Sequence, residues 1–158
     1  MQISVIDFET KYAADFKRLN IEWLDKYELT EPADISMLEN YKAEILDTGG
    51  CIILAKAGNE IVGSAALIQE APGEFELAKM AVTTAYQGKG ISKLLIEKCL
   101  AKAKELKASK FFLVSSSKLN TALSLYEKYG FKHVPVIDNH YTNADVRMEL
   151  MINSPDGA

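Results

Sequence analysis

A glycine-rich turn, QGKGIS from Gln87 to Ser92, joins an apolar strand pattern to a long amphipathic helix pattern. Glycines let a loop turn tightly and let a ligand approach the backbone closely. The first N–H groups of a helix lack partners within the helix and lie at the positive end of its dipole. Such a turn therefore suits a phosphate, although glycine can also serve only to relieve strain. Because one residue separates Gly88 from Gly90, neither a Walker loop nor a GxGxxG motif fits.

Length and composition predict one domain, residues 1–153, followed by a frayed tail over 154–158. The chain has 158 residues, of which 48% are hydrophobic, enough for one core. It contains no run of about 18 apolar residues and no basic-then-apolar leader, so we expect a cytoplasmic protein without a membrane partner. Cys51 and Cys99 lack CxxC spacing and a histidine cluster, which favours reduced structural thiols and no metal site.

Charge is unevenly distributed, although the net charge is only −4 and gives no reason to expect a nucleic-acid partner. Residues 79–118 hold nine lysines against two acids. Most of these lysines can form an ordinary solvated helix face. Lys89 lies inside the glycine turn, and we assign it to phosphate.

Hydrophobic periodicity predicts an α/β (α+β) fold with the order β-α-α-β-β-β-α-β-α-β-β. The expected sheet is mixed, mostly antiparallel, with about six or seven strands and about four helices packed against it. Repeats and low-complexity segments are absent. Strands are expected at 3–8, 51–58, 61–71, 75–82, 111–116, 131–137 and 145–152, and helices at 12–27, 32–46, 91–106 and 120–129.

This order, with QGKGIS after the fourth strand and LNTALSLYEKYGF downstream, resembles the GNAT superfamily of acetyl-CoA-dependent N-acyltransferases over nearly the whole chain. The family's pyrophosphate loop is Q/R-x-x-G-x-G/A, and Gln87, Gly90 and Ser92 occupy the three specified positions. Ser92 departs from the pattern, but its small size predicts at most a modest change in coenzyme affinity. The segments LNIEWLDKY, ELAKMAV and YTNADVRMEL resemble a bacterial branch of the superfamily.

The resemblance implies that acetyl-CoA lies between the fourth and fifth strands. The backbone of Met80, Ala81 and Val82 would bind the pantetheine arm, and the Met80 N–H would stabilise the thioester oxyanion by about 3 kcal/mol. Asn120 would contact the same arm, or would serve as an ordinary N-cap. The pyrophosphate would be bound by Gln87, Gly88, Lys89, Gly90, Ile91 and Ser92.

The resemblance also implies two catalytic residues, Tyr126 and Glu76. Tyr126 would give a proton to the departing thiolate, or would be a core aromatic, a role that suits Tyr129 better. Glu76 would take the proton of the acceptor amine, directly or through water, with ordered water alone or Glu74 as alternatives. The amine would attack the thioester directly in a ternary complex, so the cysteines should be dispensable for chemistry.

We therefore expect an N-acetyltransferase that acts on a primary amine of a small molecule or peptide. A non-catalytic acyl-CoA-binding module, or transfer to another acceptor or of another acyl group, is the alternative. Residues 22–76 hold twelve acids and three lysines, which favours a cationic amine, although surface solvation explains the same count. Homodimers are common in the family, but the sequence does not indicate the oligomeric state. Pocket candidates are Trp23, Tyr27, His140 and Tyr141, although Trp23, at helical spacing, suits the core better.

Overall fold

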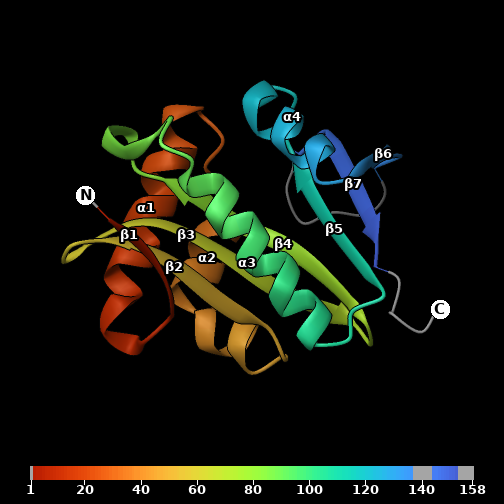
Figure 1. Cartoon of the computed structure of the whole chain (residues 1–158), viewed down its shortest axis with the longest axis horizontal. Coiled ribbons are helices and arrows are strands. Elements are labelled where there is room, and N and C mark those ends of the chain that lie inside the picture. The colour runs from red at the N-terminus through yellow and green to blue at the C-terminus, as the bar shows by residue number, and fades with distance from the viewer. Residues whose placement is uncertain (1, 137–143, 153–158) are drawn as a thin grey trace.

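The computed structural model of the protein describes residues 2–136 and 144–152, arranged as one twisted sheet with helices on both faces (Figure 1). Seven strands form the sheet in the order β1-β2-β3-β4-β5-β7-β6. The strands are β1 (Ile3–Asp7), β2 (Cys51–Ala57), β3 (Glu60–Ala71), β4 (Glu74–Val82), β5 (Lys110–Ser115), β6 (Lys132–Val134) and β7 (Val146–Met151). The helices are α1 (Ala13–Lys26), α2 (Pro32–Glu39), α3 (Ile91–Glu105) and α4 (Asn120–Lys128), with short helical turns at Thr10–Tyr12, Lys42–Leu46 and Thr84–Tyr86.

The element order and the sheet type confirm the predicted fold class. All neighbouring strands pair antiparallel except β4 and β5, which are parallel. The ends of elements differ from the prediction by a few residues, as expected where only periodicity marks a boundary. The predicted strand at 131–137 is shorter in the structure, and its last residue lies outside the described residues.

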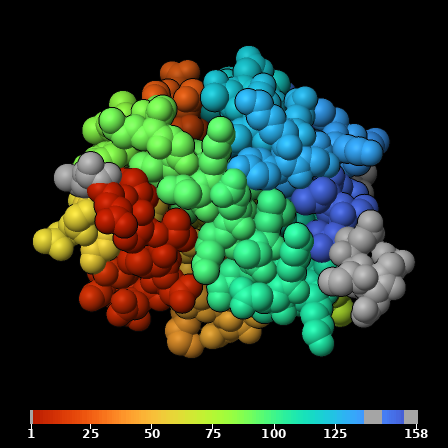
Figure 2. Space-filling view, in the orientation of Figure 1, coloured from red at the N-terminus to blue at the C-terminus, as the bar shows by residue number. Residues whose placement is uncertain are grey.

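Two hydrophobic cores lie on opposite faces of the sheet. Alternation along β2 separates them, because Ile53 faces one core and Ile52 and Leu54 face the other. The first core lies under α3 and α4, and the second under α1 and α2. Figure 2 shows α3 (green to teal) filling the middle of one face, with N-terminal residues (red) on one side and C-terminal residues (blue) on the other.

The second predicted helix, expected to run to Leu46, is wrong in length. α2 starts well, with Pro32 in its first turn and a capping box between Glu31 and Asp34. It ends at Glu39, and the chain continues through Asn40 into a short π-helical turn. Asparagine is a poor residue for a helix interior because its side chain competes for backbone hydrogen bonds, which accounts for the break.

β4 and β5 pair over only three residues each, Glu74–Glu76 with Lys110–Phe112. Beyond Glu76 the two strands no longer pair, so the remainder of β4 faces a gap in the middle of the sheet. No helix among the described residues has the length and apolar character that a membrane span requires.

β4 also carries a bulge on its other edge. The register with β3 stops at Ala78 and resumes at Ala81, so Lys79 and Met80 together lie opposite Ala65. Lys79 has φ +54°, in the left-handed region that side chains with a Cβ rarely adopt. A bulge inserts an extra residue, bends the strand and re-aims the side chains that follow.

Candidate active site

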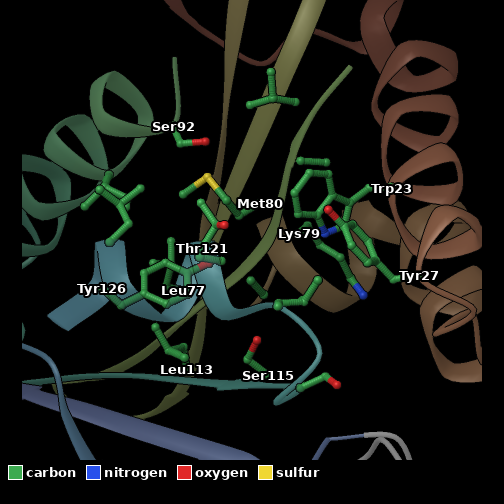
Figure 3. A pocket seen from close by; sticks show the side chains of 18 of the residues that line it. Trp23, Tyr27, Leu77, Lys79, Met80, Ser92, Leu113, Ser115, Thr121 and Tyr126 are labelled. Atoms are coloured by element: carbon green, nitrogen blue, oxygen red, sulfur yellow. The ribbon is translucent and has the colours of Figure 1, made fainter. Parts of the chain in front are cut away.

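A cavity of about 950 Å³ occupies the gap between β4 and β5. It is lined by residues of α1, β4, the glycine turn, α3, β5 and α4. In Figure 3, Met80, Ser92 and Tyr126 lie on one side of this cavity, and Trp23, Tyr27 and Lys79 lie on the other. The cavity brings together nearly all the predicted site residues: Glu76, Met80, Ala81, Val82, Gln87, Gly88, Gly90, Ile91, Ser92, Asn120 and Tyr126. Lys89 is exposed and does not line it, so its assignment stays a prediction.

The glycine turn is held in a conformation that its glycines make possible. Gly88 has φ +78° and Gly90 has φ +79°, and Gly90 is the N-cap of α3. A Cβ placed at either glycine would meet no other atom within 4 Å. Packing therefore does not require these glycines. They set the turn geometry and leave open space in front of the first N–H groups of α3, where an anion would bind.

The Gln87 side chain anchors this turn to its surroundings. Its Nε2 donates to the Val82 carbonyl oxygen over 3.0 Å, and its Oε1 accepts from Lys26 Nζ over 3.1 Å. The end of β4 and the end of α1 are thus both tied to the start of the turn. In this structure Gln87 serves as a support for the turn, whereas the backbone that follows it faces the cavity.

Glu76 is a buried carboxylate at the point where β4 leaves β5. Glu76 is among the residues that line the cavity, and it is only 6% exposed. The pKa of Glu76 is raised to about 7, chiefly by burial and also by the negative charge of Glu70, while the positive charges of Lys79 and Arg147 oppose the rise. A carboxyl group with a pKa near the working pH can both accept and release a proton, as a general base must.

The raised pKa of Glu76 has a cost in stability whose sign can be tested. The unfolded carboxyl titrates near 4.5 and the folded one near 7, so the folded state holds the proton more tightly between these values. Stability from this group therefore falls as pH rises through that window, by about 3 kcal/mol in total. We expect Glu76→Gln, which cannot ionise, to gain stability relative to wild type between pH 5 and pH 8. Urea unfolding at the two pH values measures the difference in the free energy of unfolding between Glu76→Gln and wild type. A difference that is the same at pH 5 and pH 8 would contradict the raised pKa of Glu76.

Tyr126 is both a core residue and part of the cavity wall. It is 8% exposed, and its ring packs against Phe131 with the ring centroids 6.0 Å apart. Burial raises the pKa of Tyr126 above its usual value, so its hydroxyl stays protonated throughout the neutral range. The expectation that Tyr129 is the better core residue is wrong, because Tyr129 is half-buried and its hydroxyl donates to Glu97 over 2.7 Å.

Asn120 is the first residue of α4, and the N-cap position belongs to Leu119. The alternative that Asn120 serves as an ordinary N-cap is therefore wrong. Asn120 is exposed at the cavity, where its role toward a ligand stays a prediction. Cys51 and Cys99 are free thiols outside the cavity lining, and the described residues contain no cluster suited to hold a metal ion.

The side of the cavity next to α1 and α2 contains two predicted aromatic residues. Trp23 and Tyr27 both line it, with their ring centroids 5.1 Å apart, and Trp23 also packs against the second core. The other two candidates, His140 and Tyr141, lie outside the described residues.

Polar residues that the sequence did not single out surround the bulge in β4. Lys79 Nζ lies 2.9 Å from Asp34 Oδ1, and the two side chains are only 5% and 7% exposed. Asn20 and Ser64 form a second buried polar contact beside them. The available signal was a lysine in the middle of an apolar strand, which also suits a solvent-facing position.

Comparison with known proteins agrees with this geometry. The family model of the acetyltransferase (GNAT) domain matches residues 21–152. The chain belongs to this family. Among solved structures, a GNAT-family acetyltransferase from Staphylococcus aureus superposes with a TM-score of 0.84 at 23% identity, covering 94% of this chain and 98% of that one. The PaiA N-acetyltransferase from Thermoplasma acidophilum, solved with coenzyme A, gives 0.77 at 19% identity, covering 96% and 100%.

Curated relatives of this GNAT chain have different acceptors in their names. N-acetylaspartate synthetase from Xenopus tropicalis is 35% identical over 118 residues, which are 74% of this chain and 43% of the relative. The ribosomal protein bS18-alanine N-acetyltransferase of Haemophilus influenzae is 36% identical over 83 residues, 52% of this chain and 56% of the relative. The chain thus spans about half the length of these relatives.

Proposed function

We propose that this GNAT domain transfers the acetyl group of acetyl-CoA to a primary amine. The observation that carries the proposal is one continuous cavity that contains the glycine turn, the open edge of β4, buried Glu76 and Tyr126. Each of these serves a different part of the reaction. The coenzyme A bound to the structurally similar PaiA protein supports the choice of donor.

The donor would bind along the gap between β4 and β5. The N–H groups of the turn from Gly88 to Ser92 would bind its pyrophosphate, helped by the dipole of α3. The backbone of Met80, Ala81 and Val82 would pair with the amides of the pantetheine arm, as an added strand pairs with a sheet edge. The absence of a β5 partner for this part of β4 supports that role.

The transfer would proceed by direct attack within the cavity. The acceptor arrives as an ammonium ion, and the Glu76 carboxylate takes one of its protons, directly or through water. The free amine attacks the thioester carbonyl, whose oxyanion accepts a hydrogen bond from the Met80 N–H. As the carbon–sulfur bond breaks, Tyr126 gives its proton to the thiolate. The nitrogen then loses its second proton to the Tyr126 oxygen, directly or through water, and Glu76 releases the first proton to solvent, which leaves an acetylated amine and free coenzyme A.

The acceptor would lie on the side of the cavity next to α1, near Trp23 and Tyr27. Two relatives are named for aspartate and for an alanine of a ribosomal protein, which favours an amine carried by an amino acid or a peptide. The acid Glu31 lines the same side and attracts a cationic amine, whereas the charge of Asp34 is compensated by Lys79.

The proposal is tested by incubating the protein with acetyl-CoA and a panel of amino acids, peptides, polyamines and aminoglycosides. Release of free thiol and the mass of the acetylated product are followed together. We expect turnover with at least one amino acid or peptide. Tight coenzyme binding without turnover across the panel would instead favour a non-catalytic binding module. Failure to bind any coenzyme A ester would overturn both the acetyltransferase and the binding module.

Replacement of Tyr126 by phenylalanine should lower kcat by about tenfold. A thiol with a pKa of about 8.5 is a fair leaving group, so it benefits from a hydrogen bond but does not require full protonation. Because burial raises the pKa of Tyr126, its contribution should not be lost as pH rises to 9. Steady-state kinetics of Tyr126→Phe measure the effect, with Tyr129→Phe as the control for a hydroxyl outside the cavity. Equal activity of Tyr126→Phe and wild type would show that Tyr126 does not donate a proton to the thiolate.

A further inference from the structure

We propose that Asn20, Ser64 and Asp34 are positioning residues that hold Lys79 in its strained conformation and thereby aim the Met80 N–H at the reacting carbonyl. The inference rests on the proposed function, because it concerns the oxyanion contact of that reaction. It adds two buried clamps, one on the Lys79 carbonyl group and one on the Lys79 side chain.

The backbone of Lys79 has a positive φ that its place within a strand does not explain. Three non-glycine residues among those described have positive φ: Glu28, Lys79 and Lys107. Glu28 and Lys107 directly follow the C-caps of α1 and α3, where a left-handed residue is common. Lys79 lies within β4, where extended backbone is the rule. Strain of this kind persists only where the surrounding structure enforces it.

The first clamp acts on the Lys79 carbonyl group. Ser64 Oγ donates to the Lys79 carbonyl oxygen over 2.7 Å, and Asn20 Nδ2 donates to Ser64 Oγ over 3.0 Å. Asn20 Nδ2 also donates to the Phe16 carbonyl oxygen over 2.9 Å, which fixes it to α1. Ser64 is 0% and Asn20 is 2% exposed, so water does not compete for these contacts. The chain of donors therefore connects α1 through β3 to the bulge.

The second clamp acts on the Lys79 side chain. The Lys79–Asp34 ion pair is almost completely buried, and Asp34 Oδ2 also accepts from the Glu31 N–H over 3.0 Å within the capping box of α2. Breaking a buried pair by removing one partner leaves an uncompensated charge, which is strongly unfavourable. The start of α2 and the bulge are thus held in a fixed relation.

These clamps determine the direction of the next amide. The peptide unit between Lys79 and Met80 is planar, so the Lys79 backbone angles set where the Met80 N–H points. If Lys79 relaxed to ordinary strand geometry, that N–H would rotate with the peptide plane. An oxyanion donor is effective only when it is already aimed at the developing charge.

The test compares glycine with alanine at position 79 in an Asp34→Asn background. Asparagine keeps an oxygen for the capping box and leaves no unpaired carboxylate at position 34 when the lysine is removed. Glycine adopts positive φ freely, whereas alanine retains the Cβ that opposes it. On the high-pH plateau of the rate profile, where loss of the Lys79 charge near Glu76 does not limit the rate, we expect the Asp34→Asn/Lys79→Gly variant to keep kcat within about threefold of wild type. The Asp34→Asn/Lys79→Ala variant should lose about tenfold or more. Affinity for coenzyme A should be equal in both.

Equal kcat in the two double variants, whether high or low, would overturn the inference. Ser64→Ala provides a second measurement should the alanine double variant fold poorly. It should lower kcat by about tenfold while the Kd for coenzyme A stays unchanged, and an unchanged kcat would equally overturn the proposal. Absence of turnover in the wild-type protein would instead count against the proposed function, so the two failures are distinguishable.

Discussion

Replacement of Glu76 by glutamine should reduce kcat/KM at pH 7.5 by about 100-fold or more, while coenzyme affinity stays within about twofold. Glutamine has the size of glutamate but cannot accept the ammonium proton. The loss should be large because the acceptor is mostly protonated at this pH and buried Glu76 lines the cavity at the point where β4 and β5 separate. Initial rates across a range of amine concentrations measure the effect.

The pH profile gives this prediction a second readout. The base must be ionised to work, so wild-type kcat/KM should rise with pH and level off above the raised pKa of about 7. The Glu76→Gln variant should lack this rise. Glu74→Gln is the matched control, because Glu74 is half-buried on the same strand and lies 3.6 Å from Lys110 Nζ, outside the cavity lining. If Glu74→Gln lost activity while Glu76→Gln kept it, Glu74 and not Glu76 would be the base.

Replacement of Gly90 by leucine should weaken coenzyme A binding by about 100-fold or more. Leucine disfavours the φ of +79° that places the first N–H groups of α3 around an anion, and its side chain would enter the open space in front of them. Two lost hydrogen bonds to a charged group account for a change of this size. Isothermal titration calorimetry with coenzyme A measures it.

Gly73→Leu controls for backbone strain in the Gly90 experiment. Gly73 has φ +76° in the turn before β4, at the opposite end of that strand from Gly90. A Cβ there would lie 3.2 Å from the Ser109 hydroxyl, the end of a short side chain that can move. Both variants should lose stability, but only Gly90→Leu should lose coenzyme affinity. Equal affinity of the two variants for coenzyme A would remove the anion role of the turn.

The order of elements was predictable because periodic patterns and turn residues mark each one. The roles of the glycine turn, the edge of β4 and Tyr126 were predicted from the family resemblance, which short motifs carry, and the cavity brings these residues together. The burial of Glu76 could not be predicted, because its exposure depends on packing between segments that are distant in the sequence. ELAKMAV gives no local sign that a strand-end glutamate will be 6% exposed.

The bulge in β4 made the orientation of the Lys79 side chain unpredictable from the sequence. Strict alternation would place it on the same face as Leu77, which packs in the core under α3. The extra residue instead turns Lys79 to the opposite face, where Asp34 of α2 lies. A bulge shifts every later side chain relative to the simple pattern, and nothing in the single sequence marks where it falls.

Glu76, the proposed base, occupies the last position at which β4 pairs with β5, so the sheet itself fixes its backbone relative to the gap. The cavity residues Trp23 and Tyr27, proposed to contact the acceptor, belong to α1 and its C-cap, which pack on the sheet without being part of it. A lineage with this fold could therefore change its acceptor by substitution and insertion in peripheral segments while inheriting the transfer chemistry intact. Such a division is consistent with the different names of two relatives that are 35% and 36% identical to this chain over the matched residues.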